Sequence, residues 1–167
     1  MTTKGLYFQN VIAVIWDFDR TLSPSYMQRP IFEAYDIDET MFWAEVRALP
    51  EYYRRAGVKV QEDTCYLGHL LSYVKHGKLP NLTNVKLQEL GAQIKLFAGL
   101  PEFFGRLEAV LNEPEYISGD LRLEHYVVST GLDAMLRGTP IADHVTGIWA
   151  SAFIEEPAAP ATDLKRT

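Results

Sequence analysis

The feature that most constrains the fold is an uninterrupted apolar run, residues 11–16, that ends on Asp17. Its side chains, Val-Ile-Ala-Val-Ile-Trp, show no alternation of apolar and polar positions. A short run of this kind is typical of a strand that is buried on both faces, as in a parallel sheet. We therefore predict an α/β protein with this strand inside its sheet.

Two later segments are candidates for further strands of the same sheet. Residues 126–128 (Tyr-Val-Val) are apolar and are followed by Ser129 and Thr130. A weaker candidate covers residues 145–149. The pattern between the first two strands is mainly helical, so we expect a long insertion to interrupt the sheet.

The insertion covers residues 25–97 and carries start and stop signals for several helices. Asp38 and Thr83 are suited to cap helix N-termini because their side-chain oxygens can accept from backbone N–H groups. Gly57 and Gly77 are suited to end helices because glycine adopts left-handed conformations readily. These signals predict an α-helical insertion.

The remaining segments complete the predicted organisation. A helix is expected to begin at Pro101. A loop over residues 112–123 is expected to connect this helix to the second strand. The predicted fold is a parallel sheet core at residues 1–24 and 98–154, an α-helical insertion at 25–97, and a frayed tail at 155–167.

Composition and charge narrow the classes of partner. The chain has 167 residues, with 16 Lys and Arg against 22 Asp and Glu, for a net charge of −6. A nucleic-acid partner is disfavoured because such an interface needs a basic face. No apolar run is long enough to cross a bilayer, so no membrane partner is expected. The single cysteine, Cys65, fits a reducing compartment, and we expect a cytoplasmic protein.

Asp17, Asp19 and Thr21 follow the first strand directly. In open α/β sheets, ligands bind beyond the carboxyl ends of the strands, where these residues are expected to lie. The first carboxylate can attack an electrophile, while the second protonates a leaving group and later deprotonates water. Attack on a phosphate dianion needs a hard cation such as Mg²⁺ to offset the charge repulsion. Thr21 is expected to bond the second acid or the phosphate.

Ser129, Thr130 and Gly131 follow the second strand and are candidate substrate-binding residues. The Ser129 hydroxyl is suited to donate to a phosphoryl oxygen, with the N–H groups of Thr130 and Gly131 close by. The alternative is that Ser129 and Thr130 cap the N-terminus of a helix over residues 132–137.

These residues resemble the motifs of the haloacid dehalogenase superfamily. An apolar strand that ends in Asp-x-Asp-x-Thr, here Asp17, Asp19 and Thr21, is similar to the first motif. The strand that ends on Ser129 is similar to the second motif, and the helical insertion resembles the cap of phosphoserine-phosphatase-like members. The resemblance covers roughly residues 10–153.

The resemblance implies a Rossmann-like core with an inserted α-helical cap at residues 25–97. It also implies a mechanism. It implies an aspartyl-phosphate intermediate at Asp17, general acid–base catalysis by Asp19, and Mg²⁺ held by the Asp17 side chain and the Asp19 backbone carbonyl. Dehalogenases of the superfamily lack the second acid, so Asp19 favours phosphoryl transfer. The expected function is a Mg²⁺-dependent phosphomonoester hydrolase that acts on a small phosphorylated substrate. The alternatives are a phosphotransferase or mutase of the same superfamily, and a non-catalytic binding domain.

The third and fourth motifs of the superfamily, a basic residue and an acidic cluster after another strand, have no clear counterpart. Lys165 lies in a polar tail, and Glu155, Glu156 and Asp163 follow no apolar strand. We therefore expect either a truncated phosphatase or a degenerate, inactive member. The absent strand would lie beside the first strand. The exposed sheet edge is expected to form a homodimer or to be covered by another piece of chain.

The insertion also carries basic and aromatic side chains whose positions the sequence leaves open. The basic residues either face a phosphorylated substrate or form a solvated helix face, and their pattern favours the solvated face. They are Arg47, Arg54, Arg55 and Lys59. The aromatic residues are expected to form the small core of the insertion, with one or two of them lining a substrate cleft.

Overall fold

The computed structural model describes residues 10–156, so the expected tail at 157–167 lies outside the described residues. Three strands form one parallel sheet in the order β1–β2–β3. They are β1 at Val11–Trp16, β2 at Arg122–Leu132 and β3 at Gly147–Ser151. The chain is therefore a mixed α/β protein with a small parallel sheet, in which β2 occupies the centre.

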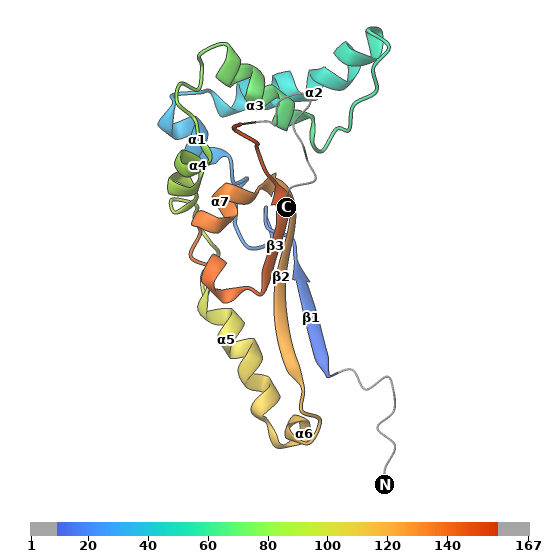
Figure 1. The fold of residues 1–167 in the computed structure, drawn as a ribbon, viewed down its shortest axis with the longest axis vertical. Helices are drawn as coiled ribbons and strands as arrows, with labels where there is room; N and C mark the ends of the chain where they lie inside the picture. The colour runs from blue at the N-terminus through green and yellow to red at the C-terminus, as the bar shows by residue number, and fades with distance from the viewer. Residues whose placement is uncertain (1–9, 157–167) are drawn as a thin grey trace, which may run out of the picture.

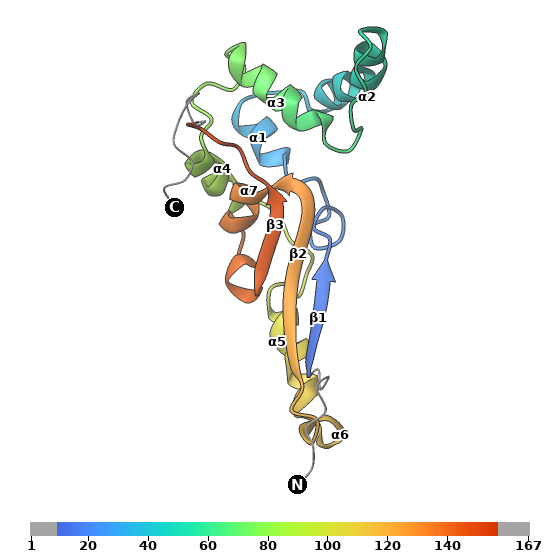
Figure 2. The same ribbon diagram turned by 45° about the vertical axis from the view of Figure 1, so that its right-hand side comes forward.

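Helices occupy most of the chain between β1 and β2. They are α1 (Arg29–Ala34), α2 (Glu39–Arg55), α3 (Cys65–Lys75), α4 (Asn84–Gly91), α5 (Glu102–Ala109), η1 (Val110–Asn112) and α6 (Pro114–Ile117), followed after β2 by α7 (Asp133–Gly138) and η2 (Ala142–His144). Figures 1 and 2 show α1, α2 and α3 beyond the carboxyl ends of the strands, whereas α5 and α7 lie along one face of the sheet. Among residues 10–156, no helix is long and apolar enough to cross a membrane.

The predicted helix signals in the insertion are confirmed. The Asp38 side chain accepts from the Met41 N–H at 3.0 Å, and the Thr83 hydroxyl oxygen accepts from the Lys86 N–H at 3.1 Å. Gly57 follows α2 with φ at +77°, a left-handed conformation that glycine adopts without steric cost. These local interactions explain why α2 and α4 begin, and α2 ends, where the sequence predicts.

The buried side chains of the helices and the sheet belong to one hydrophobic cluster. Phe42 on α2 and Leu70 on α3 are in the same cluster as Val127 on β2 and Leu136 on α7. Helices of the insertion and the sheet therefore share apolar packing. The division of the chain into a core and a cap at residues 25–97 stays a prediction.

The prediction that β1 is buried on both faces is wrong. β1 lies at the edge of the sheet, and Ile12 and Ile15 remain 45% and 68% exposed. Helix α5 covers only one face, where Phe104 packs edge-on against Trp16 with ring centroids 5.8 Å apart. An apolar run does not distinguish a strand covered on both faces from one that still has an uncovered face.

The predicted loop at residues 112–123 is also wrong in part. This segment contains η1, α6 and the first residues of β2. β2 starts earlier than its apolar run because the Arg122 N–H donates to the Asn10 carbonyl at 2.7 Å, which extends the ladder past β1. Because Arg122 and Glu124 are polar, the apolar pattern of the sequence did not predict this part of the strand.

Helices α4 and α7 approach each other at backbone distance because each contributes a glycine to the contact. A Cβ atom at Gly91 on α4 would overlap the Met135 carbonyl oxygen on α7. A Cβ atom at Gly138 would overlap the Gln88 carbonyl oxygen on α4. The two glycines allow α7 to pack close to α4 of the insertion. Helix α7 directly follows the predicted site residues of β2.

We predict that Gly91→Ala lowers the free energy of unfolding by about 1–3 kcal/mol, because the added methyl group forces two backbones apart. Gly68→Ala is the matched control, since a Cβ at Gly68 on α3 would meet no atom within 4 Å. The control should be neutral or stabilise by up to about 1 kcal/mol through helix propensity. Urea denaturation measures both, and equal stabilities for the two variants would contradict the predicted close contact.

Candidate functional site

The loop after β1 is built around Phe18, which is fully buried. Its carbonyl oxygen accepts from the N–H groups of Leu22 at 2.9 Å and Ser23 at 3.1 Å, which folds the chain into a tight turn. Asp17 and Asp19 flank Phe18, and burial of Phe18 leaves both acids on the other side of the chain. The turn therefore holds the two acids at the carboxyl edge of the sheet, as predicted.

Asp17 is exposed, and one of its carboxylate oxygens is fixed by a neighbour. The Thr21 hydroxyl donates to Asp17 Oδ2 at 2.9 Å. Of the two expected partners of Thr21, the second acid is wrong, because the turn brings Thr21 back to the first acid. The contact of Thr21 with a phosphate stays a prediction. Within residues 10–156, Asp17 Oδ1 accepts no hydrogen bond, so it is available to an incoming group.

Asp19 is half-buried and has an unusual pKa. Its Oδ1 atom accepts from the Met27 N–H at 2.9 Å. Burial raises the pKa of Asp19 from 3.8 to about 6, and the charge of Asp17 adds to the rise, while the Met27 bond and Arg20 oppose it. A carboxyl group with this pKa can both release and take up a proton near neutral pH, which suits a general acid and base.

The predicted residues Ser129, Thr130 and Gly131 all lie inside β2, close to its carboxyl end. The Ser129 Oγ atom accepts from the Gly131 N–H at 3.0 Å. Helix α7 begins at Asp133 without a side-chain cap, so the alternative that Ser129 or Thr130 caps this helix is wrong. Ser129 keeps its own O–H group as a donor, whereas the Gly131 N–H is already engaged.

Tyr66 connects α3 to this end of the sheet. Its hydroxyl donates to the Thr130 carbonyl at 3.0 Å, and burial raises the pKa of Tyr66, so the donor keeps its proton. Tyr66 and Thr130 line a cavity of about 820 Å³ that also contains Asp19. The acid, the end of β2 and helix α3 therefore face one cavity.

The rest of this cavity comes from α1, α2 and the segment before them. Trp43 lines it together with Tyr66, which confirms that aromatic residues of the insertion border a cleft. Gln28 also lines it, and its side chain is 2% exposed with Oε1 unpaired among residues 10–156. Sequence reasoning missed Gln28 because a lone glutamine before a helix belongs to no motif.

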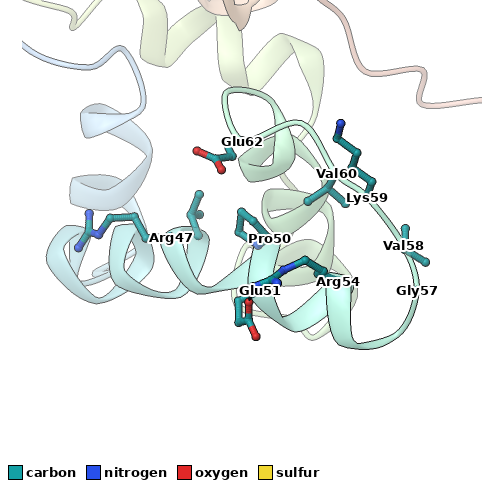
Figure 3. Close-up of a pocket in the computed structure, with 10 residues that line it drawn as sticks. Arg47, Pro50, Glu51, Arg54, Gly57, Val58, Lys59, Val60 and Glu62 are labelled. Atoms are coloured by element: carbon teal, nitrogen blue, oxygen red, sulfur yellow. Dashed lines mark hydrogen bonds and ion pairs between the residues drawn. The ribbon is translucent and has the colours of Figure 1, made fainter.

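A second cavity of about 690 Å³ lies between α2 and the loop that follows it (Figure 3). Arg47 lines both cavities, whereas Lys59 lines only the second. Arg54 and Arg55 are exposed and pair with Glu51 on their own helix. The prediction of a solvated basic face is thus confirmed for Arg55, while Arg54 and Lys59 border the second cavity and Arg47 borders both.

The candidate metal ligands form a sparse donor set. Among the described residues, no group of three or more His, Cys, Asp and Glu side chains could hold a metal ion. The Asp17 carboxylate and the Asp19 carbonyl are nevertheless hard oxygen donors. Mg²⁺ commonly takes one or two carboxylates, keeps several waters and binds substrate phosphate oxygens. The donor chemistry of these two residues therefore fits Mg²⁺.

Of the acids and the lysine considered for the third and fourth motifs, only Glu155 and Glu156 lie within the described residues. Glu155 accepts a hydrogen bond from the backbone N–H of Asn84, at the start of α4. Asp163 and Lys165 lie outside the described residues. The assignment of these acids and of Lys165 to the third and fourth motifs stays a prediction.

Comparison with known proteins shows that the chain is similar in sequence to a longer protein. No protein-family model matches the chain. A protein of Borreliella burgdorferi, described as an uncharacterized protein, is 34% identical over 158 residues. The alignment covers 94% of the chain and 55% of that protein, so the chain spans about half the length of the relative it matches. This description assigns no activity, substrate or cofactor.

The raised pKa of Asp19 predicts a pH-dependent stability. Between pH 4 and 6 the folded chain holds a proton that the unfolded chain releases, so the free energy of unfolding falls as pH rises through this window. Asp19→Asn removes this loss and keeps an oxygen for the Met27 N–H. We expect the variant to be more stable than the wild type by about 1–3 kcal/mol at pH 8, and nearly equal at pH 4.

Urea denaturation at both pH values measures this difference. Asp143→Asn is the control, because Asp143 is an exposed acid on η2. The control should follow the wild type at both pH values. A stability gain for Asp19→Asn that is equal at pH 4 and pH 8 would contradict a raised pKa.

Proposed function

We propose that the chain is a Mg²⁺-dependent phosphomonoester hydrolase of the haloacid dehalogenase superfamily, with a Rossmann-like core and an α-helical cap. Its substrate is a small phosphorylated metabolite. The observation that carries the proposal is the Asp19 carboxyl group, whose pKa of about 6 suits acid–base catalysis. This group borders a cavity and lies two residues after the exposed carboxylate of Asp17.

Asp17 is the nucleophile in this proposal. Its free oxygen attacks phosphorus while the Thr21 hydroxyl holds the other oxygen. The bond between phosphorus and the ester oxygen breaks, and Asp19 gives its proton to that oxygen, so the alcohol leaves neutral. The product of this step is a phosphate ester of Asp17 beside an ionised Asp19.

Asp19 then reverses its role. The ionised carboxylate takes a proton from a water molecule, whose oxygen attacks phosphorus and releases inorganic phosphate and the free Asp17 carboxylate. The desolvation that raises the pKa of Asp19 supports both proton transfers. It keeps a proton on the acid for the first step, and it makes the carboxylate a better base than an exposed aspartate in the second. The cavity beside Asp19 offers room for a leaving group.

Ser129 orients the phosphoryl group. Its Oγ atom accepts from the Gly131 N–H, which fixes the oxygen and leaves the O–H proton free for a phosphoryl oxygen. Bound Mg²⁺ would be held by the Asp17 carboxylate and the Asp19 carbonyl, where it supplies the positive charge that offsets carboxylate–phosphate repulsion. The proposed compartment is the cytoplasm, which suits a chain with a single cysteine.

We predict that Asp17→Asn lowers the kcat for p-nitrophenyl phosphate by at least about 10³-fold, because the amide lacks the nucleophilic oxygen charge. Release of p-nitrophenol in the presence of MgCl₂ measures the rate. Asp36→Asn serves as control, since Asp36 is an exposed acid after α1 whose left-handed conformation asparagine tolerates. Undiminished turnover by Asp17→Asn would contradict the assignment of the nucleophile.

Binding of a phosphate mimic separates a catalytic chain from a non-catalytic binding domain. MgCl₂ with beryllium fluoride should raise the Tm of the wild type by about 5–10 °C at about 100 times the Kd. It should not raise the Tm of Asp17→Asn, which cannot hold the mimic on its carboxylate. A wild-type Tm that stays unchanged would favour the non-catalytic alternative, while transfer of phosphate to an alcohol acceptor would favour a phosphotransferase.

A further inference from the structure

The cavity beside Asp19 is lined by a buried side chain, Gln28, that has an unpaired polar atom. Gln28 is 2% exposed, and its Oε1 atom accepts no hydrogen bond within residues 10–156. A buried acceptor without a donor carries a free-energy penalty, and folded proteins keep few of them. Gln28 lines the same cavity of about 820 Å³ as Asp19. The unpaired group therefore belongs to the wall of the proposed substrate site.

The neighbours of Gln28 decide which end of its amide group is unpaired. The Tyr66 hydroxyl donates to the Thr130 carbonyl at 3.0 Å, so the hydroxyl oxygen is free to accept. A side-chain hydrogen bond with Gln28 opposes the rise in the pKa of Tyr66. A bond with this effect stabilises the phenolate, so the Gln28 amide nitrogen is its donor. The nitrogen is thus engaged, and Oε1 is the atom that lacks a partner.

The backbone fixes Gln28 beside the proposed acid. The N–H group of the preceding residue, Met27, donates to Asp19 Oδ1 at 2.9 Å. The Gln28 carbonyl accepts from the Ile31 N–H at 2.9 Å, where α1 begins. The segment that carries Gln28 is therefore held by Asp19 on one side and by α1 on the other.

Trp43 contributes a second buried atom without a partner to the same cavity. Its indole N–H donates to no acceptor in the part of the chain that the structure describes. Trp43 lies on α2, and its ring centroid is 5.7 Å from that of Tyr66, which is the hydrogen-bond neighbour of Gln28. The cavity that contains Asp19 is thus lined by an unused acceptor and an unused donor.

An unused acceptor and an unused donor together select the chemistry of a ligand group. An ammonium group only donates, so it can pair with Gln28 Oε1 but not with the Trp43 N–H. A carboxylate only accepts, so it can pair with the Trp43 N–H but not with Gln28 Oε1. A hydroxyl group donates and accepts through one oxygen atom and can pair with either. The two atoms therefore favour hydroxyl groups over charged groups.

We propose that Gln28 and Trp43 form a hydroxyl-binding subsite, and that the substrate is a phosphate monoester of a polyhydroxy alcohol. This inference rests on the proposed hydrolase function, and it names the class of alcohol that Asp19 protonates. The Trp43 ring is only half-buried, and a turn of this ring gives a substrate hydroxyl access to both atoms. Binding then removes a penalty that the ligand-free chain carries, so substrates without the hydroxyl are disfavoured.

Hydrolysis of two matched esters tests the subsite. Sorbitol phosphate and n-hexyl phosphate have carbon chains of equal length, but only the first carries hydroxyl groups. With MgCl₂, the kcat/KM of the wild type should be at least about 100-fold higher for sorbitol phosphate, because hexyl phosphate leaves both atoms unpaired. Gln28→Met has a side chain of similar length without the acceptor. It should lower this ratio of kcat/KM values at least about 10-fold.

Two further variants complete the experiment, and circular dichroism confirms that each variant is folded. Trp43→Phe keeps an aromatic ring but lacks the indole N–H, so it should also lower the ratio at least about 10-fold. Thr40→Val is the matched control, because Thr40 lines the same cavity but is exposed, and this variant should keep the wild-type ratio. A wild type that does not prefer sorbitol phosphate, or a ratio that Gln28→Met and Trp43→Phe both leave unchanged, would overturn the subsite.

Binding separates a failure of the subsite from a failure of the proposed hydrolysis. If neither ester is hydrolysed, the hydrolase proposal fails, and the Tm of the chain with each ester decides the subsite. A larger rise in Tm with sorbitol phosphate than with hexyl phosphate, lost in Gln28→Met, would support the subsite. Equal Tm values with the two esters would overturn it. Hydrolysis of both esters with equal kcat/KM would support the hydrolase and overturn the subsite alone.

Discussion

The geometry of the candidate site depends on Met27, which is fully buried between the two predicted motifs. Its N–H donates to the Asp19 carboxylate at 2.9 Å, and its sulfur accepts from the Leu132 N–H at 3.0 Å. Its side chain also fills the space where a Cβ atom of Gly131 would lie. One residue therefore ties the loop after β1 to the end of β2, and glycine at 131 is required by packing.

Asp19 is held in an environment that opposes its charge. The Met27 N–H and Arg20 favour the ionised carboxylate, but burial and the neighbouring Asp17 outweigh them and raise the pKa of Asp19 to about 6. A purely structural acid would gain stability from a net favourable environment. An acid that costs stability when ionised, at the edge of a parallel sheet and beside a cavity, fits a site in which proton transfer is useful.

Local signals in the sequence predicted more of the structure than long-range ones. The caps at Asp38 and Thr83 and the acids at the end of β1 depend on neighbours within a few residues, and they lie where the sequence places them. The roles of Met27 and Gln28 depend on contacts with segments far along the chain, so no motif contained them. The start of β2 was missed because it is fixed by a backbone bond to Asn10 and not by apolar side chains.

The apolar run of β1 shows why the burial of a strand cannot be predicted from its own side chains alone. Side chains on one face of β1 pack against α5, as Trp16 does against Phe104, while Ile15 on the other face remains in water. The sequence is equally apolar on both faces, which is the pattern of a strand covered on both faces. Ile12, on the same face as Trp16, also remains 45% exposed, so the helices leave part of β1 in water on both faces.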